Sequence, residues 1–387
     1  ERPTHRNAEP MSRKRTATRI TGVVKNAALL GASLLFTIVV AELALRATGY
    51  RPTLADPGMY EAHDDEYLPY RMRAGYEGYY MGKKVRLDED GYRVVENGGS
   101  SAVVGRQDVA HTVLLLGDSV VFGHGLEGDE TPASQLQALY AAADETVRVR
   151  PVRVKNVAAS GYTTWNELAA LEDYLARYDV DTVVLVFLEN DITFDHNQLR
   201  LTDGEFGNIG STPLHRATQA LYRSVYLSYL VRNGIETVRA MLSAKAHSFD
   251  AAPSEAGPTA ASSAASPATS PTISPAASPT TSRLDSPAFD HTLEGLARMQ
   301  ALCEREGTDL KVGIYRDVTF YDDLQGTLAY EARLAEAFAA LGIESFVIGS
   351  HVEQLDRRAV RIAWNDPHPT ADAVGYIARD IRRAVEE

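Results

Sequence analysis

A serine stands directly behind a short apolar run in "TVLLLGDSVVFGHGL", residues 112–126. The run has the length and composition of a buried strand, and Gly117 and Asp118 end it. A serine at the carboxyl end of a strand can present its Oγ to a substrate, where backbone N–H groups bind an oxyanion. A hydroxyl needs a neighbouring base before it can attack. Ser119 is thus either a nucleophile or a polar turn residue, depending on whether a base lies near it.

The best candidate for that base is His368, in "WNDPHPTADAVGY". Asp366 precedes it by two residues, and a carboxylate beside an imidazole holds its tautomer and stabilises the imidazolium. The alternative is that Asp366 caps a turn and His368 lies on the surface. His124, in "FGHGL", is closer to Ser119 along the chain but has no adjacent carboxylate, so we expect a loop role for it.

Two further segments that follow apolar strand-like runs offer hydrogen-bond donors. "NVAASGYTTWNE" contains Gly161, and "VFLENDI" contains Asn190. A glycine lets a substrate approach its N–H closely, and an asparagine offers a side-chain NH₂ without a charge. Each could equally be an ordinary turn residue. Together they predict two donors for an oxyanion.

The order Ser119, Gly161, Asn190, His368 resembles the four blocks of the SGNH, or GDSL-type, hydrolases. The matching stretches are "LLLGDSVVFGHG", "NVAASGYT", "LVFLEND" and "NDPHPTADAVGYIA". The resemblance implies a flavodoxin-like three-layer α/β/α fold and hydrolysis of esters without a metal or cofactor. It also implies that Ser119 is the nucleophile, His368 the base and Asp366 its orienting acid. The Ser119 N–H, Gly161 and Asn190 would form the oxyanion hole.

The sequence departs from the family pattern at two positions. Leu188 stands where the third block usually has a glycine, so the backbone there is expected to differ. In the last block the acid usually lies three positions before the histidine, where this chain has Asn365, and Asp366 is one residue closer. Asp191 is expected to brace its loop rather than react.

Alternating strand and helix patterns between residues 111 and 387 predict an α/β domain with a parallel sheet of about five strands. In such sheets ligands bind at the carboxyl ends of the strands. The expected strands are 112–116, 152–157, 182–187, 309–315 and 344–349, and the expected helices are 132–142, 164–178, 287–306, 328–341 and 371–385.

The N-terminal region has the pattern of a membrane anchor. A basic stretch, residues 1–26, precedes an apolar segment at 27–45 that approaches the length of a membrane span. The basic flank predicts a cytoplasmic N-terminus and an extracytoplasmic catalytic domain, periplasmic or on the cell surface. The alternative is a signal peptide cleaved after Ala41, which would release the protein.

Two segments lie outside the alternating pattern. Residues 51–106, rich in tyrosine and glycine, predict an ancillary β-rich segment that packs on the main domain. An insertion at 192–288 contains a helical stretch, 213–242, for which packing on the domain is favoured over capping the site or facing a membrane. It also contains a loop at 251–282, rich in Pro, Ser, Thr and Ala, which predicts disorder.

Composition restricts the partners. The formal net charge of −13 argues against nucleic acid, because phosphate binding needs clustered Lys and Arg. The one cysteine, Cys303, falls on an apolar helical face, so a buried structural thiol is expected.

Three functions remain open from the sequence. The first is an exported serine esterase or deacylase. The second is an O-acyltransferase acting on an envelope polysaccharide, which differs only in whether a sugar hydroxyl or water accepts the acyl group. The third is a non-catalytic binding protein with the same fold. The substrate itself cannot be read from the sequence.

Overall fold

The protein is described from a computed structural model. The described residues are 11–51, 58–96, 111–142, 151–196, 201–202, 205–206, 213–232, 234–235, 281–316, 323–350, 360–363 and 366–387. They fall into two compact units. Unit 1 comprises the described residues of 1–52 and 213–260, and unit 2 those of 53–212 and 261–387.

Unit 2 is built on a parallel sheet of five strands in the order β11-β10-β7-β5-β6. The expected α/β fold with a parallel sheet is therefore confirmed. The three central strands are almost entirely buried, since helices cover both faces of the sheet. The strands are β5 (His111–Gly117), β6 (Val152–Ala158), β7 (Thr182–Phe187), β10 (Asp309–Tyr315) and β11 (Glu344–Ile348).

The strand order reverses at β5. From β5 the chain moves outward to β6, and then crosses back to β7 on the other side of β5. Because parallel crossovers are right-handed, this reversal puts α3 (Pro132–Ala141) on one face of the sheet and α4 (Thr164–Leu175) on the other. In open α/β sheets, ligands bind at the carboxyl ends of the strands where the strand order reverses. The residues just after Gly117 therefore lie at the place where this class of sheet binds ligands.

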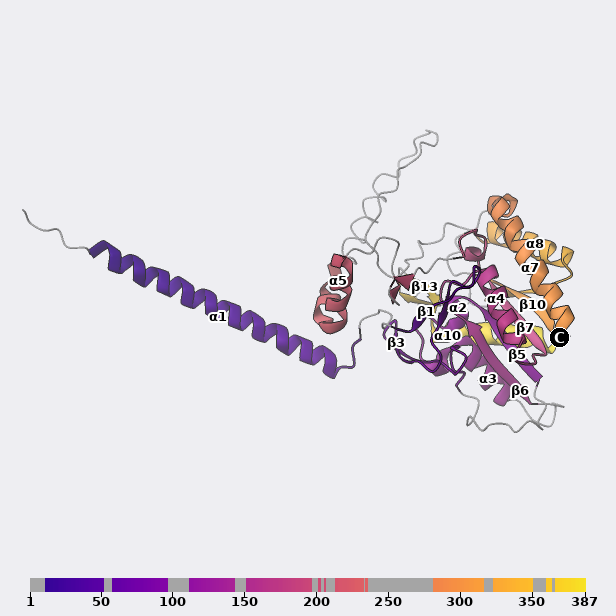
Figure 1. Cartoon of the computed structure of the whole chain (residues 1–387), viewed down its shortest axis with the longest axis horizontal. Coiled ribbons are helices and arrows are strands. Elements are labelled where there is room, and N and C mark those ends of the chain that lie inside the picture. The colour runs from indigo at the N-terminus through magenta and orange to yellow at the C-terminus, as the bar shows by residue number, and fades with distance from the viewer. Residues whose placement is uncertain are drawn as a thin grey trace, which may run out of the picture. The chain divides into compact units, whose positions relative to one another are not determined.

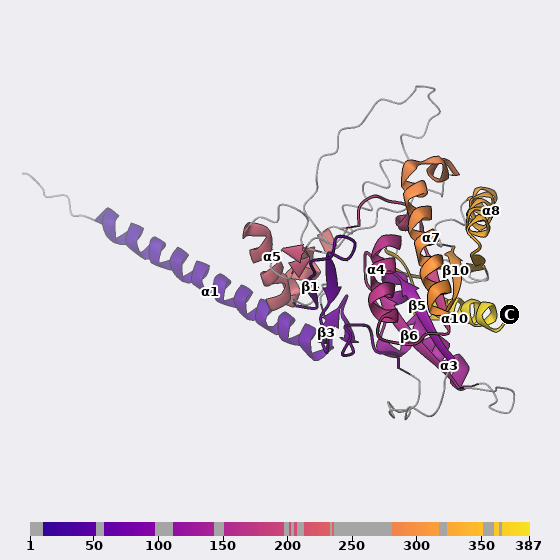
Figure 2. The ribbon, with the colours of Figure 1, turned by 45° about the vertical axis from the view of Figure 1, so that its right-hand side comes forward.

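Helices on both sides of the sheet complete a three-layer α/β/α arrangement. α4 packs against α7, and α3 packs against α10; Figure 2 shows α4 and α7 side by side over the strands. Each of these helices begins at a Ser or Thr cap, as helix starts require. They are α3 (Pro132–Ala141), α4 (Thr164–Leu175), α7 (Pro287–Glu306) and α10 (Ala371–Glu386), together with α8 (Leu324–Ala340) beside β11.

One expectation about strand order is wrong. The strand at 344–348 is not the last, because β12 (Arg361–Ala363) and β13 (Asp366–Pro369) form an antiparallel pair after it. His368 lies on β13. The two prolines of β13 hid this strand, because proline is disfavoured in strands except at edges and bulges.

Four short strands form the ancillary segment of unit 2: β1 (Tyr60–Ala62), β2 (Tyr70–Met72), β3 (Glu77–Tyr80) and β4 (Lys83–Arg86). They pair as two antiparallel hairpins, β1 with β2 and β3 with β4. Their buried tyrosine and methionine side chains belong to the same hydrophobic core as the main sheet. The described residues of this segment therefore pack on the α/β layers.

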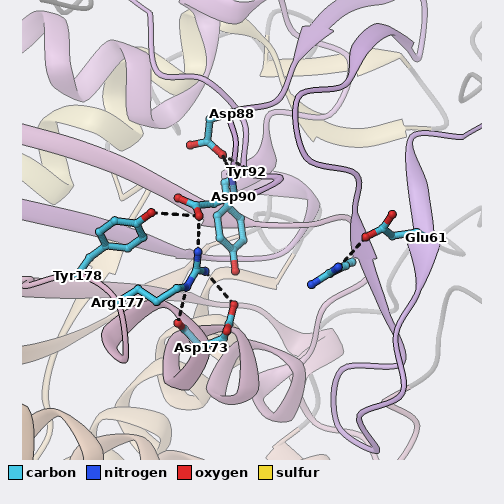
Figure 3. A network of polar contacts seen from close by, with 8 residues as sticks. Glu61, Asp88, Asp90, Tyr92, Asp173, Arg177 and Tyr178 are labelled. Atoms are coloured by element: carbon cyan, nitrogen blue, oxygen red, sulfur yellow. Dashed lines mark hydrogen bonds and ion pairs between the residues drawn. The ribbon is translucent and has the colours of Figure 1, made fainter. Parts of the chain in front are cut away.

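A polar network also joins the ancillary segment to α4 (Figure 3). The Arg177 guanidinium, just after α4, lies between the carboxylates of Asp90 and Asp173. The Tyr178 hydroxyl donates to the same Asp90 oxygen at 3.1 Å. Arg177 is partly exposed, so the ion pairs contribute little stability by themselves. Their effect is to fix where the turn around Asp90 meets the helix.

Unit 1 contains α1 (Met11–Ala47) and α5 (Pro213–Ser224), both visible in Figure 1. Residues 226–232 continue as a second helical stretch after a break at Val225. Residues 28–47 of α1 are apolar and long enough to cross a membrane, and a signal sequence passes the same test. The described contacts of residues 224–227 are with α1. Whether the inserted helix packs on the main domain stays a prediction.

Most of the segment expected to be disordered lies outside the described residues. The part outside the described residues is 251–280. The last two residues of the segment, Thr281 and Ser282, belong to a 3₁₀ helix, η3 (Thr281–Asp285).

Candidate functional site

Ser119 is the first residue of a short helix, α2 (Ser119–Phe122), directly after β5. Asp118 caps this helix, because its Oδ1 accepts the Val120 N–H at 2.9 Å. Gly117 makes the sharp turn possible, since a Cβ there would lie 2.6 Å from a methyl of Val121. The strand, turn and cap together hold the Ser119 side chain at the carboxyl edge of the sheet.

His368 meets Ser119 across 249 residues of sequence. Its Nε2 lies 2.8 Å from the Ser119 Oγ. This is the distance at which a neutral imidazole accepts a hydroxyl proton. Both side chains are largely buried, at 5% exposed for Ser119 and 7% for His368. The structure therefore brings together the serine and the histidine that the sequence singles out.

Asp366, the predicted partner of His368, begins the same strand, β13. Its side chain lies outside the described residues, as does all of Asn365. Its role as the orienting acid therefore remains a prediction.

Asn190 is held at the site by Asp118. The Asn190 Nδ2 donates to the Asp118 Oδ2 at 2.8 Å, and the Ser119 Oγ lies 3.4 Å from the same oxygen. Burial raises the pKa of Asp118, while its hydrogen bonds to Val120 and Asn190 oppose that rise. One N–H of the Asn190 amide is used on Asp118. The role of Asn190 as an oxyanion donor stays a prediction.

The loop before Asn190 adopts an ordinary backbone although it lacks the usual glycine. Leu188 has a φ of −119°, which any residue can adopt. Its N–H donates to the Asp191 Oδ2 at 2.7 Å. Asp191 thus braces the loop, as expected, and leucine is compatible with this position.

Gly161 reaches the same edge of the sheet through strand register. Gly117 of β5 pairs with Ala158 of β6, so Ser119 and Gly161 follow their strands by two and three residues. Gly161 has a φ of +79°, a left-handed conformation that glycine adopts without strain.

His124 lies in the turn after α2, as expected, and its ring packs against His368. The two imidazole rings are stacked, with centroids 3.9 Å apart and planes 11° from parallel. This stacking contact does not change the expectation that His368, and not His124, is the base. The structure adds a packing role that sequence reasoning missed: one face of the His368 ring is covered by another imidazole.

Tyr80, on β3 of the ancillary segment, positions His124 in turn. Its hydroxyl lies 3.0 Å from the His124 Nδ1 and 2.9 Å from the Ser160 Oγ. Ser160 directly precedes Gly161. One hydroxyl from the ancillary segment therefore links the ring that covers His368 to the loop that carries Gly161.

The Tyr80→Phe variant tests this link. Loss of one hydrogen bond of about 0.5–1.5 kcal/mol should lower kcat on an ester substrate by roughly 2- to 10-fold and leave KM nearly unchanged. Steady-state kinetics on p-nitrophenyl acetate measures both constants. Tyr178→Phe removes an exposed hydroxyl in the Asp90 network and serves as the matched control. Equal kinetics in the two variants would contradict a positioning role for Tyr80.

Two buried carboxyl groups lie behind the Asn190 loop. Glu167, on α4, is fully buried, and neither of its carboxyl oxygens has a hydrogen-bond partner among the described residues. Burial raises the pKa of Glu167, and the neighbouring Asp191 and Asp118 raise it further. Burial also raises the pKa of Asp191, which differs from Glu167 in accepting the Leu188 N–H. A buried carboxylate without a donor is unstable, so Glu167 is the group that we expect to hold a proton.

The protonated Glu167 predicts a pH-dependent stability. Its pKa is raised in the folded state, so the folded state binds a proton that the unfolded state releases above the ordinary glutamate pKa near 4.3. The free energy of unfolding should therefore fall as pH rises above that value, by about 1.4 kcal/mol per pH unit while the proton is retained.

Glu167→Gln removes this dependence, because glutamine has nearly the same shape and no proton to release. We expect the variant to be more stable than the wild type at pH 8, and the difference to shrink toward pH 5. Thermal unfolding at several pH values measures the effect. Glu172→Gln, an exposed position on the same helix, is the matched control. The control should keep the wild-type pH slope, and an unchanged slope in Glu167→Gln would overturn the assignment of the proton.

Within the described ranges, His, Cys, Asp and Glu side chains form no group of three or more that could hold a metal ion. His196 and His291 bring their Nε2 atoms within 3.0 Å, a distance that one neutral donor and one acceptor explain. Cys303 is 1% exposed, and burial raises the pKa of its thiol to about 12, so the expected buried thiol is confirmed.

The comparisons with known proteins find similarity only to solved structures. No family model and no curated protein matches the chain. Structures that resemble it include TesA, at 14% identity over 71% of this chain and 98% of the other, with a TM-score of 0.37. The psychrotrophic esterase EstA from Pseudoalteromonas sp. shows 12% identity over 71% and 97%, with a TM-score of 0.39. The acetylxylan esterase Axe2 from Geobacillus stearothermophilus shows 13% identity over 72% and 97%, with a TM-score of 0.38.

Proposed function

We propose that this protein is a serine esterase. Ser119 attacks the acyl carbonyl, and His368 Nε2 accepts the Oγ proton as the new C–O bond forms. His368 then gives that proton to the leaving alcohol as the acyl-enzyme is made, and water repeats the sequence to release the acid. The observation that carries the proposal is the 2.8 Å contact between the Ser119 Oγ and the His368 Nε2 at the carboxyl edge of the sheet.

The oxyanion of the tetrahedral intermediate would be held by the Ser119 N–H, the Gly161 N–H and the Asn190 amide. The hydrogen bond from Asn190 to Asp118, which also caps the turn at Ser119, supports this assignment. Uncharged donors fixed before the reaction stabilise the developing charge without reorganisation. Asp366 would orient His368 from its place two residues earlier on β13.

The protein would act outside the cytoplasm, tethered by the apolar helix at residues 28–47. Acyl esters of an envelope carbohydrate or lipid would be its substrates. This placement rests on the length and apolarity of that helix and on the basic residues before it.

Covalent labelling of the full chain in detergent tests the proposal. A fluorophosphonate should form a stable adduct that mass spectrometry places on the peptide containing Ser119, and p-nitrophenyl acetate should be hydrolysed. Absence of both would contradict the esterase and favour a binding protein with this fold. An adduct accompanied by transfer of the acyl group to added oligosaccharide, in preference to water, would identify an acyltransferase instead.

A further inference from the structure

The end of α1 carries an acid that serves as a helix cap. The Glu42 carboxylate accepts the Tyr226 N–H at 3.1 Å and the Leu227 N–H at 2.9 Å. These two residues open the helical stretch 226–232, where the first N–H groups have no partner within the helix. A negative charge is favourable at that end of a helix. A charged side chain near the end of an apolar span costs free energy to place there. Glu42 therefore has a role at this position, which is to hold a second segment.

Arg46, one turn further along α1, joins the same segment. It pairs with Glu42 at 2.8 Å, donates to the carbonyl of Ser224 at 2.8 Å, and lies over the Tyr226 ring at 4.3 Å. Ser224 is the last residue of α5, where a cation complements the helix dipole. Arg51 adds a hydrogen bond to the Tyr226 hydroxyl at 2.9 Å. We call the described residues of 213–235 the foot; it is fastened to α1 at the carboxyl end of the apolar stretch.

The foot keeps apolar side chains exposed. Leu221 is 50% exposed, Leu230 40%, Val231 53% and Ile235 54%. Three tyrosines accompany them: Tyr226 packs edge-on against Tyr50, and Tyr222 against Tyr229. Tyrosines with apolar neighbours are typical of the boundary between lipid headgroups and acyl chains.

The charge of the foot also favours binding to an anionic lipid surface. Between Pro213 and Arg232 it contains three arginines and no acidic residue, although the whole chain carries a net charge of −13. Basic residues beside an apolar helical face are typical of segments that lie in the plane of a bilayer containing anionic lipids.

We propose that the foot lies on the surface of the bilayer that α1 crosses, with Leu221, Leu230, Val231 and Ile235 in the headgroup and acyl-chain boundary. The proposal rests on the membrane anchor of the proposed function. The apolar stretch of α1 ends at Ala47, so Glu42 and Arg46 lie where the hydrocarbon gives way to headgroups. A segment bonded to those two side chains is held at that depth, and the bilayer is what covers its apolar residues.

Lipid quenching of a fluorophore at Val231 tests the proposal in the full chain. Cys303 is buried, so a thiol-reactive NBD dye should label only an introduced cysteine, and the unsubstituted protein provides the labelling blank. Val231→Cys, Leu35→Cys and Ala301→Cys place the dye on the foot, in the middle of the span and on an exposed position of α7. Each variant is reconstituted in nanodiscs of phosphatidylcholine and phosphatidylglycerol that carry a doxyl quencher at acyl carbon 5 or carbon 12.

We expect the Val231 dye to be quenched most by the carbon 5 label, the Leu35 dye most by the carbon 12 label, and the Ala301 dye by neither. A Val231 dye that behaves like the Ala301 dye, beside a quenched Leu35 dye, overturns the foot while the anchor stands. A Val231 dye that self-quenches only when two chains share a disc identifies a second copy as the occupant and also overturns it. An unquenched Leu35 dye overturns anchor and foot together.

Turnover of p-nitrophenyl acetate, measured on the same discs, reports separately on the esterase. The quenching pattern does not depend on turnover, so failure of the esterase proposal and failure of the foot give different results. Glu42→Gln provides an internal check on the cap. Loss of its charge should loosen the foot and reduce quenching at Val231, with quenching at Leu35 unchanged.

Discussion

Ser119→Ala is expected to lower kcat on p-nitrophenyl acetate by roughly 10⁴- to 10⁶-fold and to abolish the fluorophosphonate adduct. His368→Ala should cost about as much, because the His368 Nε2 lies 2.8 Å from the Ser119 Oγ and a serine hydroxyl attacks poorly without a base. The two side chains act as one unit, so the double variant should be hardly slower than either single variant.

The residual rate of these variants is informative as well. The proposed oxyanion hole does not depend on the serine side chain, so Ser119→Ala should keep some acceleration over water. Stopped-flow assays on the full chain measure the fast turnover of the wild type, and assays over long times measure the slow turnover of the variants. Ser345→Ala, on the distant edge strand β11, is the control for handling and folding. A Ser119→Ala variant with wild-type turnover would remove Ser119 from the mechanism, and multiplicative losses in the double variant would show that His368 acts elsewhere.

The second large effect is expected at Arg93, a buried cation in the ancillary segment. Its guanidinium donates to three backbone carbonyls in the loop after Ser119, those of Phe122 at 3.0 Å, Gly123 at 2.7 Å and Leu126 at 2.6 Å. It also lies over the Phe122 ring, at 5.1 Å from the centroid. Burial lowers the pKa of Arg93 to about 10, so the side chain stays charged at neutral pH.

Arg93→Met leaves those carbonyls buried without their donors. Each hydrogen bond from a charged group contributes about 1.5–3 kcal/mol, and a partial rearrangement recovers some of it, so we expect a loss of about 3–4 kcal/mol in unfolding free energy. In a unit of this size that is a fall of roughly 10 °C in Tm. Differential scanning calorimetry of the full chain in detergent measures it.

Arg86→Met is the matched control for Arg93. Arg86 also lies in the ancillary segment and pairs with Glu96 at 2.9 Å, but it is 43% exposed. An exposed pair contributes at most about 1 kcal/mol, so its loss should change Tm by only a few degrees. Similar Tm values for the two variants would show that Arg93 does not hold the loop.

The main sheet could be predicted from the sequence because its strands are short, apolar and rich in β-branched residues. β7 and β10 begin and end at the predicted residues, β6 and β11 differ by one residue at one end, and β5 is one residue longer at each end. The strand that carries His368 could not be predicted, because its two prolines contradict ordinary strand preferences. His368 was found from its neighbours in sequence, and its approach to Ser119 is a property of the fold.

The contacts that the ancillary segment makes with the site could not be predicted from the sequence. Tyr80 and Arg93 lie among many tyrosines and arginines, and no spacing distinguishes the two that reach the site. Glu167 did leave a signal: it falls on the buried stripe of α4 with Leu168 and Leu171, where an acid is out of place. Such an acid in an apolar stripe predicts a protonated or paired group.

The two-part composition of unit 1 determines how a soluble form of the protein should be made. Deleting residues 1–52 removes Glu42 and Arg46 but leaves the foot, because the foot comes from the insertion far along the chain. Tyr226 and Tyr229, buried in the intact protein, would then be exposed beside Leu230 and Val231. Such a patch invites aggregation. A water-soluble enzyme for crystallisation should therefore lack 213–235 as well as the N-terminal helix, with a short polar linker in its place.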